Sequence, residues 1–142
     1  MTVTPIARRA PALTSVLLAA AALAACGSTV STSSFQGEQK AVAQTVANLQ
    51  TDATANEQAK ICSQDLTAAV VAKLGGKAGC EKAIKAQLAE IDSLEVDVKS
   101  VAIGAGGTTA TASVKSTYAG KSRTGTISLV REGGAWKIAG TA

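Results

Sequence analysis

The 142-residue chain contains no histidine, three cysteines and only three aromatic residues, and its formal net charge is +4. The absence of histidine removes the commonest general base, the commonest metal ligand and every nucleophile pair built on histidine. Arg8 and Arg9 supply two of the positive charges, so only about +2 remains elsewhere; without a Lys/Arg cluster or aromatic stacking platforms, nucleic-acid binding is not expected.

The first 25 residues have the pattern of an export signal. Arg8-Arg9 precedes an apolar run from Ala12 to Ala25, interrupted only by Thr14 and Ser15. This run is shorter than the roughly 20 residues that cross a bilayer, and it fits the apolar region of a signal peptide. The arginine pair is also a feature of twin-arginine signals, so both the general and the twin-arginine export routes stay open.

Residues Leu23-Ala24-Ala25 are followed at once by Cys26, and these four positions resemble the bacterial lipoprotein box. The resemblance implies a diacylglyceryl group on the Cys26 sulfur, cleavage before Cys26, and a protein anchored to the extracytoplasmic face of the cell membrane. Two acyl chains anchor stably, at about 0.8 kcal/mol per buried methylene, whereas one chain binds only marginally. The alternative is a secreted protein, cleaved near Ala22–Ala25, with an incidental cysteine at position 26.

Removal of residues 1–25 leaves enough chain for one domain, and the sequence predicts a flexible tether over 26–34 and a single α+β domain over 35–142. Cys62 and Cys80 remain once Cys26 carries lipid, and an even pair in an exported chain predicts a disulfide. Two cysteines without histidine are too few for zinc, and a catalytic thiol would lack an activating base. No metal or cofactor is expected.

Helical periodicity predicts four helices in the first half of the domain. The first covers about Phe35 to Gln50, and the fourth runs from about Cys80 to Ile91. The second is predicted from an N-cap at Asp52 to about Ile61, and the third from a cap at Ser63 to a stop at Gly75-Gly76. In this pattern Cys62 and Cys80 extend apolar stripes, so both sulfurs are expected to face the core, where they could meet.

After Asp92 the apolar period changes to two, which predicts four strands joined by hairpins at Gly106-Gly107, Ala119-Gly120 and Gly133-Gly134. Two-residue loops at these points give a consistent register, in which the following residues lie opposite each other: Ile103 and Ala110, Val114 and Gly125, Leu129 and Ile138, Arg131 and Trp136. A bulge near Lys99-Ser100 is predicted because it brings the apolar residues on either side of it into phase.

Helices followed by a curved meander resemble the nuclear transport factor 2-like cone, and more narrowly the small actinobacterial lipoproteins with that domain. The resemblance is carried by "ICSQDL" at Ile61–Leu66, "GCEKAI" at Gly79–Ile84 and "GAWKIAG" at Gly134–Gly140. It implies helices packed on a curved four-stranded antiparallel sheet, and a cone interior in which related enzymes use Asp, His or Tyr. The strand residues expected to face inward here include neither a carboxylate nor a histidine.

A tentative ligand rim is formed by Ser116, Tyr118, Arg123, Arg131 and Trp136, with Lys121 beside them. Four of these residues cluster at one hairpin end: Ser116, Tyr118, Lys121 and Arg123. They could form a cationic mouth for an anionic or carbonyl-bearing group, and the alternative is a solvated hairpin tip with snorkelling side chains. Arg131 opposite Trp136 suggests cation–π stacking, and the alternative is plain packing at the rim. We therefore expect a non-catalytic, membrane-anchored binding module for an apolar or amphipathic small ligand or an envelope protein. The alternative is an interaction module that dimerises, and an enzyme is not expected.

Overall fold

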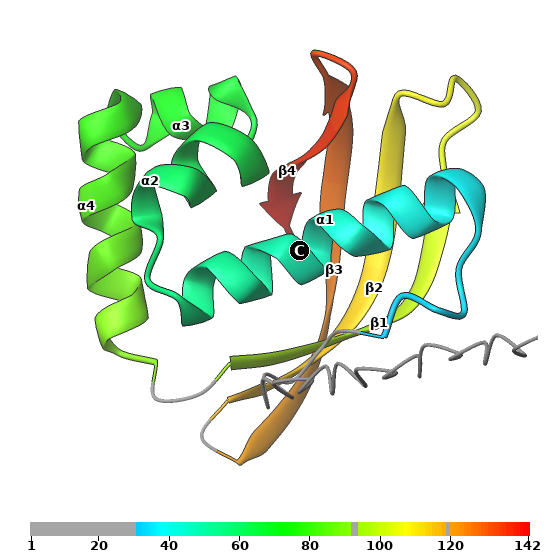
Figure 1. Cartoon of the computed structure of the whole chain (residues 1–142), viewed down its shortest axis with the longest axis horizontal. Helices are drawn as coiled ribbons and strands as arrows, with labels where there is room; N and C mark the ends of the chain where they lie inside the picture. The colour runs from blue at the N-terminus through cyan, green and yellow to red at the C-terminus, as the bar shows by residue number, and fades with distance from the viewer. Residues whose placement is uncertain (1–30, 92–93, 119) are drawn as a thin grey trace, which may run out of the picture.

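The computed structural model describes residues 31–91, 94–118 and 120–142 (Figure 1). The helical half comprises α1 (Gly37–Thr54), α2 (Gln58–Lys60), the π-helical turn η1 (Ile61–Asp65), α3 (Ala68–Lys73) and α4 (Gly76–Ala89). The strands are β1 (Leu94–Ile103), β2 (Thr109–Tyr118), β3 (Lys121–Glu132) and β4 (Ala135–Thr141). They form one antiparallel sheet in the order β1-β2-β3-β4, which confirms the α+β class and the four-stranded meander.

The predicted strand register is confirmed. The partners across the sheet are Ile103 and Ala110, Val114 and Gly125, Leu129 and Ile138, and Arg131 and Trp136. The predicted bulge lies between Val98 and Ser100. The β1–β2 loop is longer than the expected two residues, because Gly107 N–H donates to the Gly104 carbonyl at 2.9 Å and builds a wider turn.

One face of the sheet is covered by α1, which crosses the strands (Figure 1). Val42, Ala43 and Val46 are at most 1% exposed, and they belong to one core cluster with strand residues such as Ala112 and Leu129. Every second residue of β2 from Ala110 to Val114 is buried. Side chains of α1 therefore occupy the sheet face on which the sequence predicted a ligand-binding interior.

The predicted second and third helix starts are wrong. Helix α1 continues through Asp52, which is 3% exposed and whose carboxylate is bonded by Lys60 Nζ at 2.7 Å. That ammonium stabilises the buried carboxylate, so the helix does not have to end there. Ser63 lies inside η1, which is closed by a bond from Leu66 N–H to the Ile61 carbonyl. The real cap of α3 is Thr67, whose side chain accepts from Val70 N–H at 3.3 Å.

The third helix starts further along the chain than predicted, because the residues after η1 pair with β4. Leu66 forms a parallel bridge with Ile138, and Thr67 N–H donates to the Ile138 carbonyl at 3.0 Å. This pairing holds Leu66 in an extended conformation (ψ 149°), which ends η1. The fourth helix begins at Gly76, before the predicted Cys80, because Gly75 turns the chain with a φ of +92°.

The outer edge of β1 is capped by side chains of α1. Gln39 Nε2 donates to the Val101 carbonyl at 3.0 Å, and Val96 N–H donates to Gln50 Oε1 at 3.0 Å. At the opposite edge, the residues after η1 pair with β4. Both edge strands thus have backbone groups that are already bonded, which disfavours the addition of another strand.

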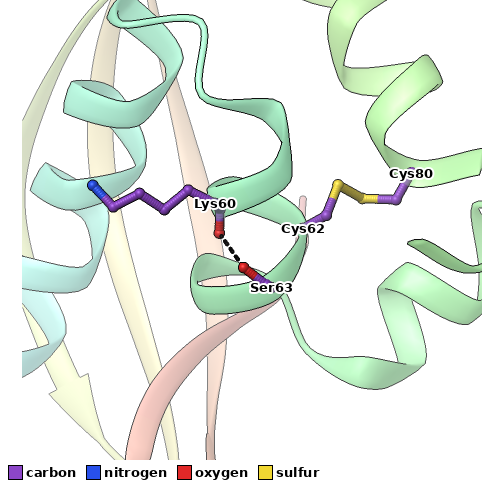
Figure 2. The surroundings of a disulfide bond; sticks show 4 residues. All are labelled: Lys60, Cys62, Ser63 and Cys80. Carbon is purple, nitrogen blue, oxygen red and sulfur yellow. Dashed lines mark hydrogen bonds between the residues drawn. A yellow bond between two sulfur atoms is a disulfide. The ribbon is translucent and has the colours of Figure 1, made fainter. Parts of the chain in front are cut away.

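The predicted disulfide between Cys62 and Cys80 is present and joins η1 to α4, with a Cα–Cα distance of 6.1 Å (Figure 2). Cys80 is the buried residue of α4, and that helix lies mainly against α2, α3 and η1 (Figure 1). The crosslink therefore attaches an outlying helix to the element that contacts the sheet. The signal segment, Cys26 and the tether up to residue 30 lie outside the described residues.

Candidate functional site

A cleft of about 580 Å³ lies between α1, η1 and the start of β4. We call it the α1–η1–β4 cleft. Its walls combine amide and hydroxyl side chains with small apolar ones; they are Ala41, Gln44, Thr45, Asn48, Ser63, Gln64, Asp65, Arg131, Gly134, Ala135, Trp136 and Lys137. A smaller cavity of about 180 Å³ is lined by Asn48, Thr51, Asp52, Lys60, Gln64 and Asp65, so the two spaces share part of their walls.

Bonds between its walls fix the shape of the cleft. Lys137 Nζ donates to the Ser63 carbonyl at 2.9 Å, which ties β4 to η1. Thr45 Oγ1 of α1 lies 3.5 Å from the Trp136 carbonyl and 3.1 Å from the Ala41 carbonyl, so it links α1 to β4. The pairing of Leu66 with Ile138 adds a third fixed point. All three walls are therefore held by the same elements that build the core.

Asp65 lies in the wall between the two spaces and is 4% exposed. Its Oδ2 atom is buried and has no hydrogen-bond donor beside it. Burial raises the pKa of Asp65 to about 7, the negative charge and hydrogen bond of Asp52 add to this shift, and Lys60 and Lys137 oppose it. Asp65 can therefore hold a proton at neutral pH, which an exposed aspartate does not do.

Asp52 of α1 lines the smaller cavity together with Asp65 and forms the ion pair there. Lys60 Nζ bonds Asp52 Oδ1 at 2.7 Å and Glu57 Oε2 at 3.0 Å. The bond to Asp52, and then that to Glu57, raises the pKa of Lys60, so the amine stays protonated. Figure 2 shows that Lys60 and Cys62 leave the chain in opposite directions, the lysine away from the disulfide. The buried carboxyl groups of Asp52 and Asp65 therefore lie in the same cavity wall as the Lys60 ammonium, which is bonded to Asp52.

Arg131, Trp136 and Glu38 form a bonded group at the β4 side of the cleft. Trp136 Nε1 donates to Glu38 Oε2 at 2.8 Å, and Arg131 Nη1 lies 3.0 Å from the same oxygen. The guanidinium carbon is 5.8 Å from the centroid of the Trp136 ring, which confirms the expected stacking. These two donors, the indole first, lower the pKa of Glu38. Trp136 is 6% exposed, so it supports the wall and does not offer a ring face for stacking.

The structure splits the predicted ligand rim into two groups. Arg123 and Arg131 are eight residues apart in β3, which corresponds to about 27 Å along a strand. Ser116 Oγ lies 3.5 Å from the Arg123 carbonyl at the β2–β3 end, and the Tyr118 hydroxyl donates to the Glu90 carbonyl. Tyr118 is 45% exposed, and Lys121 beside it is exposed too. Of the predicted rim, only Arg131 and Trp136 line the α1–η1–β4 cleft.

Sequence reasoning missed Asp52 and Asp65 as members of a site. The carboxyl groups come from the helical half, since α1 and η1 each contribute one to the walls of the cleft or of the adjoining cavity. A signal for Asp52 exists, because it follows Leu49 by three residues and so continues the apolar stripe of α1. Asp65 gives no such signal, since the π-helical turn interrupts the period of 3.6 residues.

Comparisons with known proteins do not assign the chain to a family. Neither a family model nor a curated protein matches the chain. A similar solved structure is the intermembrane space region of the chloroplast protein ARC6, at 16% identity and a TM-score of 0.47, covering 76% of this chain and 97% of that one. Among the described residues, no helix is long and apolar enough to cross a membrane. In the same part of the chain, no group of three His, Cys, Asp or Glu side chains could hold a metal ion.

Proposed function

We propose that the chain is a lipid-anchored, non-catalytic binding module on the extracytoplasmic face of the cell membrane, and that it binds a small amphipathic ligand in the α1–η1–β4 cleft. The observation that carries the proposal is the cleft itself. Its volume of about 580 Å³ lies within the range of about 300–1,000 Å³ for small-molecule sites. Its walls belong to three elements that are bonded to one another, so the site is largely preformed.

The lining residues support an amphipathic ligand. Ala41 and Ala135 offer apolar surface, whereas Gln44, Asn48 and Gln64 offer amide donors and acceptors. Several amides that converge on one space orient a ligand through hydrogen bonds, while the small apolar residues leave room for its carbon skeleton.

The nuclear transport factor 2-like cone is the fold family we propose. It is supported by the order of helices before strands, the meander topology and the bulge in β1. In this chain α1 packs against the sheet where a cone would be hollow. The ligand site therefore lies beside the cone, at the junction of α1, η1 and β4.

A variant in which a larger side chain fills the cleft should no longer bind the ligand. Ala41 is exposed on α1 and lines the cleft, so Ala41→Phe should fill the space without disturbing the core. Trp136 is the only tryptophan of the chain and lines the same cleft, so its fluorescence reports on occupancy. We expect cell-envelope extract to change the emission of the purified lipidated protein, and Ala41→Phe to reduce this change at least tenfold.

The matched control is Ala86→Phe, which introduces the same ring at an exposed position of α4 that does not line the cleft. It should respond to the extract like the unmodified protein. Mass spectrometry of the bound fraction identifies the ligand. Equal responses of the two variants would place the binding site elsewhere on the molecule.

The anchor is tested separately through Cys26. Cys26→Ala should abolish incorporation of a labelled fatty acid, because the thioether-forming sulfur is gone, and the protein should stay unprocessed or leave the membrane. The Cys62→Ala variant serves as control and should keep the label, because that sulfur is bonded to Cys80. Label that persists without Cys26 would contradict the anchor.

One observation favours a second candidate, an enzyme that uses acid–base chemistry. Asp65 lines the cleft, and its pKa is raised to about 7, in the range suited to a general acid or base. Against this, its Oδ2 atom is shielded from solvent and therefore from a substrate in the cleft. Turnover of an envelope compound that disappears in Asp65→Asn while binding persists would favour the enzyme.

A further inference from the structure

Two aspartates are buried where α1 meets η1, but a lysine bonds only one of them. Asp52 of α1 is 3% exposed and Asp65 of η1 is 4% exposed. Lys60 bonds Asp52, while Asp65 Oδ2 has no donor at all. An isolated buried carboxylate is strongly disfavoured, so this arrangement is stable only if something supplies the missing donor.

A proton on Asp65 supplies that donor. A protonated carboxyl can donate an O–H to a neighbouring carboxylate, and Asp65 and Asp52 are both buried in the lining of the same small cavity. Two carboxyl groups at such a site hold one proton between them, because both cannot ionise next to each other without repulsion. The shared proton then joins α1 directly to η1.

We propose that this shared proton is a latch between α1 and η1, which keeps the α1–η1–β4 cleft in its narrow form when present and loosens it when lost. The inference concerns regulation of the same cleft and so builds on the proposed function. Asp52 and Asp65 both line the small cavity that adjoins the cleft, and Asp65 lines the cleft as well. Loss of the proton therefore weakens the contact of α1 with η1, while the bonds that hold η1 to β4 stay in place.

The other charged groups around the pair set the pH range of the latch. Lys60 of α2 and Lys137 of β4 stabilise the ionised form of Asp65, and Glu57 shares Lys60 with Asp52. Arg131 of β3 lines the cleft but bonds Glu38. Burial and Asp52 outweigh these cations, which places the proton loss of Asp65 near pH 7.

The direction of the effect on stability follows from linkage. The folded state holds the Asp65 proton up to about pH 7, whereas an unfolded aspartate loses it near 3.8. The stabilisation by the pair is therefore complete below the unfolded value and is lost as the pH rises through about 7. Above that range the two carboxylates repel each other, and η1 should move away from α1.

The test needs no ligand. Lipidated protein with ¹³C-labelled aspartate carboxyls is titrated from pH 4 to 9, and the Trp136 emission is recorded in the same samples. We expect one aspartate signal with a midpoint near pH 7 and a Trp136 change with the same midpoint. Glu38, which bonds the indole, titrates below its ordinary range and does not interfere.

Two variants separate the latch from other titrations. Asp65→Asn keeps a donor for Asp52 at every pH, so both transitions near neutrality should disappear, and its melting temperature relative to the unmodified protein should rise from pH 4 to 7 and then level off. Asp97→Asn removes an exposed carboxylate paired with Lys99 and should leave both transitions in place.

Three results would overturn the latch. The first is the absence of any aspartate with a midpoint above pH 6; the second is an Asp65 transition without a Trp136 change; and the third is a transition that survives Asp65→Asn. None of them bears on whether the cleft binds a ligand, which the Ala41→Phe and Ala86→Phe comparison decides. Conversely, a failed binding test leaves the titration result intact.

Discussion

Removal of the Cys62–Cys80 crosslink, whose two residues are buried in the core, should be among the most damaging changes to the domain. The two cysteines are 18 residues apart in the sequence. In the chain-entropy model, closing a loop of that size lowers the entropy of the unfolded chain by about 11 cal/mol/K. At about 298 K this corresponds to about 3 kcal/mol of stability, a large share of the about 5–15 kcal/mol that stabilises a typical domain.

The structure also indicates that loss of the crosslink affects α4 most. Apart from Cys80, α4 buries no residue fully, and Ile84 and Leu88 are only partly buried against the core. Without the crosslink α4 is held by these partial contacts alone. We expect the amides of Gly76–Ala89 to exchange about 100-fold faster, since each 1.4 kcal/mol corresponds to a factor of ten.

The assay compares the unmodified protein with Cys62→Ala/Cys80→Ala in urea, and follows hydrogen exchange of α4 by mass spectrometry. Reductant should bring the unmodified protein to the midpoint of the double variant, and it should leave the double variant unchanged. A loss of less than about 1 kcal/mol with unaltered exchange of α4 would show that the crosslink constrains neither the unfolded chain nor the helix.

Three further changes test the core, the cleft wall and a helix start. Leu129→Ala empties a site that is 1% exposed and should cost about 2–5 kcal/mol in urea unfolding. Glu38→Gln should lower the melting temperature at pH 7, but this difference should vanish as the pH falls below 4.5, because the lowered pKa of Glu38 stabilises the fold only while the group is ionised. Gly79→Ala should destabilise despite the better helix propensity of alanine, since the added carbon would collide with the Leu74 carbonyl, and melting temperatures measure this.

The sheet was predictable because its pattern is local and redundant. A period of two with glycine-containing turns fixes the partners around each hairpin, so the pair Leu129 and Ile138 follows from the chain alone. The bulge at Val98–Ser100 was predictable for the same reason, since the apolar face would otherwise be out of phase. The longer β1–β2 loop could not be predicted in this way, because its hydrogen bonds leave the strand register the same as a two-residue loop would.

The helical half was harder because tertiary contacts decide its boundaries. Asp52 has the residue type of a helix cap, yet it lies within α1 because Lys60 bonds it from the next element. Ser63 could not start a helix because β4 holds Leu66 extended immediately afterwards. The carboxyl pair depends on the same contacts, which explains why the candidate site was missed while the disulfide beside it was found.

The central claim, that the α1–η1–β4 cleft binds a small envelope molecule, is tested most directly by photo-crosslinking in the native cell envelope. A photoreactive residue replaces Gln44 on the cleft wall, and in a second protein it replaces Thr111 on the exposed outer face of the sheet. We expect a small-molecule adduct of a single defined mass at position 44, which Ala41→Phe removes, and none at position 111. Adducts of equal yield at both positions, or at position 111 alone, would contradict it.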